Sequence, residues 1–436
     1  MAPDRAGGEA GLRPARRDYV VLGILAGTVG LNTVDRNMLG LLMPLIQKDV
    51  HLSDVGLGLL MGPAFVIVYS IAGVPIAWLS DKVGRRNIIA AGLAFWSSVT
   101  ACTGLAMSAG HLLIARMLLG VGEASNMAPS SALIGDMFRG SYRVMAMAVF
   151  SAGGAVAIMI FYPLIGWIAQ HHGWRPAYPI MGGIGLVITL LVLLLVREPA
   201  REDGRDATVR VEVAGDLTFR EAMGAVLRSR AFLLLCFGGT AVSINYSALL
   251  AWLPTFMQRV HGLDAQQMGA MLGMYKGLVG VAATIGGGLF VTWVMRFDAR
   301  WLAWAPILFC MGMVPAQMLL LLAQDPLLWH VGLALETILM SGVTPCLFAL
   351  LITLLDARMR ATGTALYLLI FNLVGQSVGP VLVGILNDGP LAHLGEDAVR
   401  YSLLIAPAVG ALAALMLFGL SLTMNDRHTE MDPATS

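Results

Sequence analysis

The sequence predicts an all-α membrane protein with twelve transmembrane helices in two similar six-helix bundles. Of the 436 residues, 57% are hydrophobic and only 13% are charged, whereas a soluble domain carries about 25% charged residues. Many apolar runs exceed the ~18 residues that cross a hydrocarbon core about 30 Å thick. Residues in the two halves also repeat at a single offset. These three observations together predict the fold class.

Charges, Gly and Pro bound twelve apolar runs in the sequence. The expected spans of the first half are 18–45, 55–79, 87–109, 111–137, 143–170 and 175–196. Those of the second half are 231–259, 267–295, 301–323, 328–355, 360–387 and 399–423. The domains we expect are an N-terminal tail (1–17), an N-terminal six-helix bundle (18–196), a polar linker (197–230), a C-terminal six-helix bundle (231–424) and a C-terminal tail (425–436). A short surface helix is expected near 219–227.

The two halves match at an offset of 217 residues. The matched pairs are Asp81 with Asp298, Arg143 with Arg360, and Pro163 with Pro380. Each pair occupies an equivalent place in its half, in the loop after the second span or in the fifth span. Two parallel repeats of six helices are typical of transporters whose substrate site lies between the halves near the bilayer midplane.

The distribution of basic residues predicts the orientation. An even number of spans places both termini on one side of the membrane, where 21 basic residues flank the spans, against four on the other side. Because cytoplasmic loops carry the excess of Lys and Arg, we expect both termini and the linker to be cytoplasmic. Three lysines against 25 arginines favour a bacterial chain, and therefore the inner (plasma) membrane.

Asp35 and Arg36 are two opposite charges inside the first apolar run. A charge near the bilayer centre costs at least about 2.5 to 3.5 kcal/mol, so such residues face a bundle interior or a wet cavity and usually serve function. The alternative is an internal ion pair that only maintains helix packing. Neighbouring residues point about 100° apart on a helix, so we expect these two side chains to address different partners.

The fourth span contains a second pair of opposite charges, Arg116 and Glu123. Seven residues separate them, so they share one helix face at about 10 Å along the axis. Glu123 therefore needs a partner on another helix, and Arg36 is the candidate. Burial favours the protonated form of a carboxyl group and a nearby cation favours the ionised form. Movement of the cation would thus switch the carboxyl group between holding and releasing a proton.

These residues are assigned the following roles. Asp35 and Glu123 are the candidates for proton coupling. Arg36 and Arg116 are candidates for substrate binding, because a planar guanidinium group binds carboxylate or phosphate through two bonds. Arg36 would hold an anionic headgroup, and Arg116 would keep Glu123 ionised in one state.

Further candidate cavity residues are mostly aromatic or uncharged. An aromatic residue on a membrane helix more often packs against other helices or faces lipid, and this is the alternative to a substrate-binding role for each aromatic candidate. The substrate-binding candidates beyond the arginines are Phe65, Tyr69, Glu336, Tyr367 and Asn372. An amphiphile with one anionic head and one alkyl tail would match a cavity that holds few charges.

The segment Leu79–Arg86, with the sequence LSDKVGRR, resembles the signature loop of the major facilitator superfamily, although Ala77 stands where that motif usually begins with Gly. In that family the acid and the arginines hold helices together in one transport state. The resemblance implies a gating role for Asp81 and Arg85, and Arg143 is assigned to the same group. A basic loop that only sets the topology is the alternative.

A narrower resemblance, to Spinster-type transporters, covers most of the first half. It rests on Asp35-Arg36, the segments 94–97 and 120–125, Arg116, 128–130, 136–138 and Arg143. In the second half it thins to Asn372, Gly375, Gly379-Pro380 and Asn387-Asp388. The resemblance implies transport of sphingosine phosphate or lysophospholipid, coupled to protons. The Asp-Arg pair and the Arg-to-Glu spacing also resemble anion:cation symporters, which move small organic anions.

We therefore expect a secondary active transporter that works by alternating access, is proton-coupled, and moves an anionic amphiphile such as a lysophospholipid or a sphingoid phosphate. The alternatives are a proton-coupled symporter of small organic anions and a broad drug exporter. An enzyme is disfavoured because the eight histidines lie at or near span ends and no nucleophile or metal motif is visible. No cofactor, metal or nucleic acid is expected, and the chain is expected to be a monomer in the bilayer.

Overall fold

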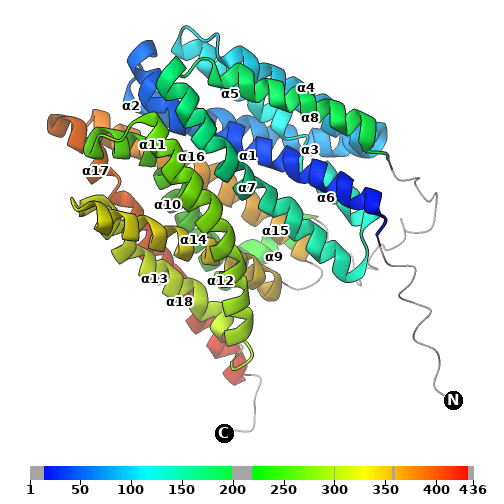
Figure 1. Cartoon of the computed structure of the whole chain (residues 1–436). Helices are drawn as coiled ribbons and strands as arrows, with labels where there is room; N and C mark the ends of the chain where they lie inside the picture. The colour runs from blue at the N-terminus through cyan, green and yellow to red at the C-terminus, as the bar shows by residue number, and fades with distance from the viewer. Residues whose placement is uncertain (1–13, 199–218, 299, 356–358, 431–436) are drawn as a thin grey trace. The chain divides into compact units, whose positions relative to one another are not determined.

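The computed structural model describes residues 14–198, 219–298, 300–355 and 359–430. Throughout these ranges the chain is helical and contains no strand (Figure 1). The all-α fold class is thereby confirmed.

The first half consists of eight helices that form six spans. Their bounds are α1 (Arg16–Val50), α2 (Asp54–Met61), α3 (Pro63–Val83), α4 (Arg85–Thr103), α5 (Ala109–Glu123), α6 (Met127–Met137), α7 (Gly140–His172) and α8 (Ala177–Leu195). The second predicted span is bent between α2 and α3, where Gly62 precedes Pro63, which has no N–H to continue the helix. The fourth predicted span is interrupted at 124–126, directly after Glu123.

The second half begins with a short helix, α9 (Phe219–Arg228), where a surface helix was expected. Three of the six spans that follow are single helices: α10 (Arg230–His261), α13 (Trp301–Leu322) and α14 (Pro326–Leu354). Two spans contain a π-helical segment: α11 (Ala265–Leu272), η2 (Gly273–Val279) and α12 (Gly280–Val294) form one, and α15 (Arg360–Ile370), η3 (Phe371–Gly375) and α16 (Gln376–Asp388) form the other. The last span consists of the 3₁₀ turn η4 (Ala392–Asp397), α17 (Ala398–Ser402) and α18 (Ile405–Glu430).

Nine helical segments in the described ranges are long and apolar enough to cross a membrane. The other three predicted spans are α1, α4, and α5 with α6. In α1 the polar group 32–37 lowers the hydropathy, and α5 is only 15 residues long. These three less apolar spans carry most of the polar side chains of the candidate site.

The chain packs into two compact units. Among the described residues, unit 1 comprises 14–52, 64–198 and 263–278, and unit 2 comprises 53–63, 219–262, 279–298, 300–355 and 359–430. The short helix α2 thus groups with unit 2 and α11 groups with unit 1. The boundaries of the two predicted bundles, 18–196 and 231–424, stay a prediction.

In unit 1, α1 packs against α7 and α8, and α4 packs against α5 and α8. Gly153 of α7 lies directly against the backbone of Ala26 in α1, so a side chain at this position would collide with α1. This close approach places the polar stretch of α1 inside the unit. It is the usual role of small residues between membrane helices.

In unit 2, α10 packs against α16 and α18, and α13 packs against α14 and α18. The apolar core of this unit includes Phe232, Leu235, Met313, Leu347 and Tyr367, each at most 1% exposed. The helix α2 packs against α16. Ser53 caps α2, because its hydroxyl accepts the N–H of Gly56 at 3.1 Å.

Candidate functional site

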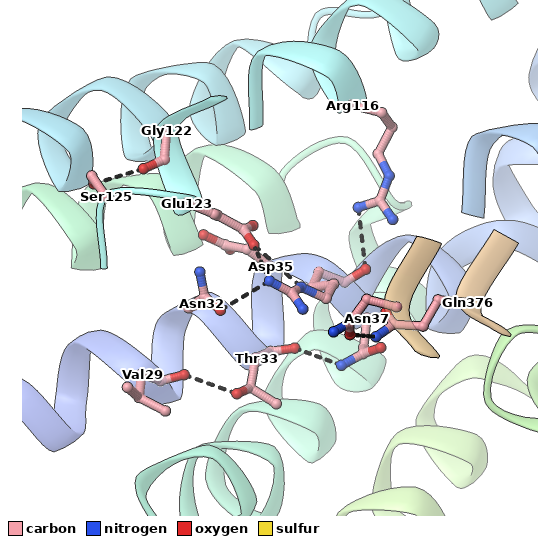
Figure 2. A network of polar contacts seen from close by, with 12 residues as sticks. Val29, Asn32, Thr33, Asp35, Asn37, Arg116, Gly122, Glu123, Ser125 and Gln376 are labelled. Atoms are coloured by element: carbon pink, nitrogen blue, oxygen red, sulfur yellow. Dashed lines mark hydrogen bonds and ion pairs between the residues drawn. The ribbon is translucent and has the colours of Figure 1, made fainter. Parts of the chain in front are cut away.

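The centre of the candidate site is an ion pair between Arg36 of α1 and Glu123, the last residue of α5. Nε and Nη2 of Arg36 both donate to Oε2 of Glu123, each at 3.3 Å. Nη2 also donates to Oδ1 of Asn32 at 3.5 Å. Figure 2 shows Asn32 and Glu123 converging from α1 and from the end of α5. The expected pairing of Arg36 with Glu123 is therefore present.

The two members of this pair differ in their access to solvent. The side chain of Glu123 is completely buried, whereas that of Arg36 is 27% exposed. Both bonds converge on a single carboxylate oxygen, so the two parallel bonds of a bidentate pair are not formed. The other oxygen, Oε1, has no hydrogen-bond partner among the described residues. The cation of the pair is thus accessible while its carboxylate is enclosed.

Two aromatic rings of α3 lie beneath the arginines. Phe65 and Tyr69 stack with their centroids 5.5 Å apart. The guanidinium carbon of Arg36 lies 4.6 Å from the centroid of Phe65 and 4.8 Å from that of Tyr69. Arg116 lies 5.3 Å from the Phe65 centroid. A ring face attracts a cation at these distances, so Phe65 attracts both guanidinium groups and Tyr69 attracts that of Arg36.

Arg116 is buried, at 4% exposure, and its Nη1 donates to the backbone carbonyl of Arg36 at 3.1 Å (Figure 2). This bond ties α5 to α1 at the point where Arg36 turns toward Glu123. The structure therefore places Arg36, Arg116, Phe65 and Glu123 in one cluster, as the sequence predicted for the two arginines and the glutamate.

Asp35 has a different hydrogen-bond partner from Arg36, as expected for neighbouring residues on a helix. It is 4% exposed, and its Oδ2 accepts the hydroxyl of Thr100 at 3.3 Å. Its Oδ1 has no hydrogen-bond partner among the described residues. A cavity of about 10 Å³ lies between Asp35, Arg116 and Tyr178, which is room for about one water molecule.

Sequence reasoning missed a polar cluster beside this site. The side-chain oxygen of Asn126, at the break between α5 and α6, accepts the hydroxyls of Thr28 at 2.9 Å and of Ser130 at 3.1 Å. All three residues are buried. The signal was present, because an amide inside an apolar run needs a partner in the same way as a charge does. The cluster anchors the helix break that follows Glu123.

The three gating candidates lie at one end of unit 1. Arg85 forms an ion pair with Asp136, the residue before the end of α6. The backbone N–H groups of Arg85 and Arg86 donate to Glu198 at 2.8 and 3.3 Å. The guanidinium group of Arg143 lies against Gly135, and the side chain of Asp81 lies outside the described part of the chain. The gating role of Asp81, Arg85 and Arg143 stays a prediction.

The remaining candidates belong to unit 2. Glu336 of α14 is 1% exposed and accepts the hydroxyl of Thr337 at 3.3 Å. Tyr367 is buried in the apolar core, stacked on Phe371 with centroids 5.7 Å apart. Asn372, in η3, donates to the carbonyl of Leu368 at 2.8 Å and accepts from Gln376 at 2.6 Å. Contact of these residues with substrate stays a prediction.

A second ion pair, in unit 2, was missed by sequence reasoning. Nη1 and Nη2 of Arg259 donate to the two oxygens of Asp54 at 2.7 and 2.8 Å. Asn387 donates to the same carboxylate at 2.8 Å. Asp54, just before the second predicted span, and Arg259, at the end of the seventh, were not among the candidate site residues. They meet because α2 and α10 both pack against α16.

Nothing in the described ranges indicates a metal site, because no three His, Cys, Asp or Glu residues cluster there. The four cysteines are free thiols, of which Cys102 is exposed and Cys236, Cys310 and Cys346 are buried.

Comparisons with known proteins agree with this architecture. The chain is 29% identical over 406 residues to an MFS-type efflux pump of Mycolicibacterium smegmatis, covering 93% of each chain. It is 26% identical over 453 residues to spinster homolog 3 of Danio rerio, covering 97% of this chain and 88% of the relative. It is also 25% identical over 308 residues to a probable galactarate/D-glucarate transporter of Escherichia coli, covering 64% of this chain and 67% of the relative.

Solved structures with the same fold include a bacterial homologue of the human lysosomal transporter Spinster, in an inward-facing and unoccupied conformation. Its TM-score is 0.79 at 24% identity, with 94% of this chain and 98% of that chain covered. A nucleoside transporter matches with a TM-score of 0.72 at 9% identity, covering 92% of this chain and 99% of that chain. The profile of the Major Facilitator Superfamily matches residues 25–380. The chain is therefore a multi-pass membrane transporter that belongs to the Major Facilitator Superfamily.

Proposed function

We propose that this transporter is proton-coupled, works by alternating access, and moves an anionic amphiphile such as a lysophospholipid or a sphingoid phosphate. The observation that carries the proposal is the Arg36–Glu123 pair, in which the cation is partly exposed and the carboxylate is buried. Such a pair offers a binding group to the substrate and a protonation site behind it.

Substrate binding and protonation are linked through Arg36. Its donors share one oxygen of Glu123 at 3.3 Å, whereas a well-formed charge-assisted bond measures about 2.7 to 2.9 Å. A phosphate or carboxylate headgroup that offers two oxygens would compete for the guanidinium group. Once Arg36 turns to the substrate, Glu123 is a buried carboxylate without its main counter-ion, and the protonated form is favoured. Substrate binding therefore promotes proton uptake at Glu123.

Asp35 is the second proposed protonation site. Thr100 donates to one of its oxygens, and the cavity beside it has room for about one water molecule. Water in that cavity would provide a short path for a proton between Asp35 and the neighbourhood of Arg116. In this scheme Arg116 helps Arg36 to keep Glu123 ionised in the state without substrate.

The aromatic rings favour an amphiphile over a fully polar solute. Tyr69 is partly exposed and provides apolar surface directly beside the guanidinium group that would hold the head, with the buried ring of Phe65 stacked against it. The 26 methionines of the chain offer adaptable surface for a flexible alkyl chain. The similarity to spinster homologues supports the same substrate class.

A small organic anion is the second candidate substrate, and the similarity to galactarate/D-glucarate transporters favours it. The similarity to an MFS-type efflux pump makes drug export the third candidate. The remaining parts of the proposal are that the chain is a monomer in a bacterial inner membrane, with both termini cytoplasmic. Asp81, Arg85 and Arg143 would open and close one end of the pathway.

The test is transport into proteoliposomes with a pH-sensitive dye inside. We expect a lysophospholipid or sphingoid phosphate to cause proton movement, and we expect Glu123→Gln to abolish that movement. Glu396→Gln, at an exposed position in η4, controls for the loss of one carboxylate. Proton movement with galactarate but not with the lipids would show that the substrate is a small organic anion. Lipid transport at a rate that does not depend on the pH gradient would contradict proton coupling.

A further inference from the structure

A groove on unit 1 lies outside the ion-pair cluster. It has a volume of about 500 Å³ and lies between α4, the 104–108 connection and α5. Its wall is almost entirely apolar, with Phe95, Val99, Ile114 and Leu118 among the lining residues. The volume falls within the range of about 300 to 1,000 Å³ typical of ligand sites.

The two hydroxyl groups that line the groove are already bonded to the backbone of α4. The hydroxyl of Ser98 donates to the carbonyl of Ala94 at 2.8 Å, and that of Thr103 donates to the carbonyl of Val99 at 2.8 Å. Both bonds run back along α4, so the groove presents carbon atoms to its occupant. Such a surface suits an alkyl chain and offers nothing to a polar solute.

The groove extends over most of one leaflet. Its lining residues on α4 run from Phe95 to Thr103, eight residues apart, which is about 12 Å along a helix. One leaflet is half of a hydrocarbon core about 30 Å thick, so the groove covers most of its depth. A single acyl chain has this reach. The groove begins at the α4–α5 connection, which lies at one membrane surface because α4 and α5 are consecutive spans.

A polar group is placed where a lipid headgroup would lie. His111 stands at the start of α5, is exposed, and lines the groove. Its Nδ1 accepts the N–H of Met107 at 3.2 Å, so in the neutral imidazole the proton is on Nε2. Nε2 is therefore a donor at the surface end of an otherwise apolar groove. The groove is thus apolar along its length and polar at its surface end, which matches the acyl chain and the headgroup of a phospholipid.

We propose that this groove binds one acyl chain of a bilayer phospholipid from the leaflet that contains the α4–α5 connection, with an ester or phosphate oxygen accepting from His111. The site is separate from the substrate site and does not rest on the proposed function. Thr103 lines both the groove and the small cavity beside Asp35 and Arg116. The bound chain therefore supports, from outside, the two helices whose inner faces carry Thr100 and Arg116.

The test uses the full-length protein in vesicles that contain a phosphatidylcholine with a photoreactive diazirine in one acyl chain. Labelled residues are mapped by proteolysis and mass spectrometry. We expect the groove residues of α4 and α5 to be labelled several-fold more than Leu190 and Leu194 of α8, which are also exposed. Equal labelling of both regions would overturn the proposal.

Two variants sharpen this test. Ser98→Phe fills the groove, and we expect labelling there to fall to the level of α8. Thr292→Phe is the matched control, because Thr292 of α12 is also exposed and its hydroxyl also bonds the carbonyl four residues earlier. It should leave groove labelling unchanged. Added phosphatidylcholine should raise the Tm of the delipidated wild type more than that of Ser98→Phe. Persistent groove labelling in Ser98→Phe, or an equal rise in Tm, would contradict the assignment.

Discussion

Two ion pairs with buried carboxylates occur in the described part of the chain, Arg36–Glu123 in unit 1 and Arg259–Asp54 in unit 2, and their geometries differ. Arg259 reaches both oxygens of Asp54 at 2.7 and 2.8 Å, and Asn387 adds a third bond at 2.8 Å. Arg36 reaches a single oxygen of Glu123, at 3.3 Å. The Arg259–Asp54 pair thus has short bonds to both carboxylate oxygens, and the Arg36–Glu123 pair does not.

This difference in bonding indicates that Arg259–Asp54 has a structural role, whereas Arg36 can exchange Glu123 for another anion. A buried carboxylate with both oxygens bonded to a cation is costly to disturb, because any rearrangement leaves a charge without a partner. A carboxylate held through one oxygen by long hydrogen bonds loses less binding energy when its partner leaves. The aromatic faces of Phe65 and Tyr69 also support Arg36 whether or not it contacts Glu123. We therefore expect Arg36–Glu123 to govern transport and Arg259–Asp54 to govern stability.

The largest expected effect is on transport by Glu123→Gln. The amide keeps the volume and accepts a hydrogen bond from Arg36 but cannot carry a proton. We expect proton-driven transport to fall roughly 1,000-fold, within the range found when a proton-transferring side chain is removed. Transport rates in proteoliposomes measure it, with Glu396→Gln as the control. A transport rate within a few-fold of the wild-type rate would contradict the assignment of Glu123 to proton coupling.

The next effect is on stability, by Asp54→Ala. The change leaves the guanidinium group of Arg259 and the amide of Asn387 without their acceptor. Breaking a buried pair costs about 3 to 5 kcal/mol, and the lower end applies because the Arg259 side chain is 20% exposed. Thermal unfolding in detergent should show a Tm lowered by several degrees. Glu123→Gln should lower the Tm less than Asp54→Ala does. A larger fall in Tm with Glu123→Gln would contradict the structural role assigned to Arg259–Asp54.

A smaller effect is expected from Arg36→Lys. The charge is kept, but an ammonium group lacks the planar fork and the stacking on Phe65 and Tyr69. We expect KM for the anionic substrate to rise by about tenfold, which corresponds to about 1.4 kcal/mol, with little change in Tm. Arg259→Lys is the matched variant, and it should lower the Tm while leaving KM near wild type. Equal effects of the two variants on KM would contradict the distinction.

The smallest effect concerns an exposed ion pair beyond the predicted first span. Trp174 donates to Asp49 at 2.9 Å and Arg175 pairs with it, and these two bonds hold the pKa of Asp49 below its ordinary value. A lowered pKa stabilises the fold fully above the ordinary Asp value of about 3.9 and loses that contribution only as the pH falls below it.

Asp49→Asn should therefore lower the Tm slightly, within the ~0 to 1 kcal/mol of an exposed pair. The difference from wild type should be constant between about pH 5 and 8. Tm measurements across that range check it, and a difference that grows toward pH 8 would point to another titrating group.

Part of the site could be predicted from the sequence because charges are rare in apolar spans. Arg36 was the candidate partner for Glu123 once helical spacing had placed Arg116 about 10 Å away, and the structure contains that pair. Asn126 and Thr100 were not predicted, because an uncharged polar residue in an apolar run gives a weaker signal. Asp54 and Arg259 were missed because residues at span ends are ordinarily solvated.

The helical class, the approximate spans and the polar stretch of α1 could be predicted from the amino-acid sequence, because hydropathy and helical periodicity are local properties of the chain. The folded structure was needed to show which oxygen of Glu123 meets Arg36, which rings lie against the guanidinium groups, and that Asp54 meets Arg259. The interruptions after Met61 and Glu123 also belong to this second group. The physical reason is that these features depend on contacts between residues far apart in the chain, which helix packing selects.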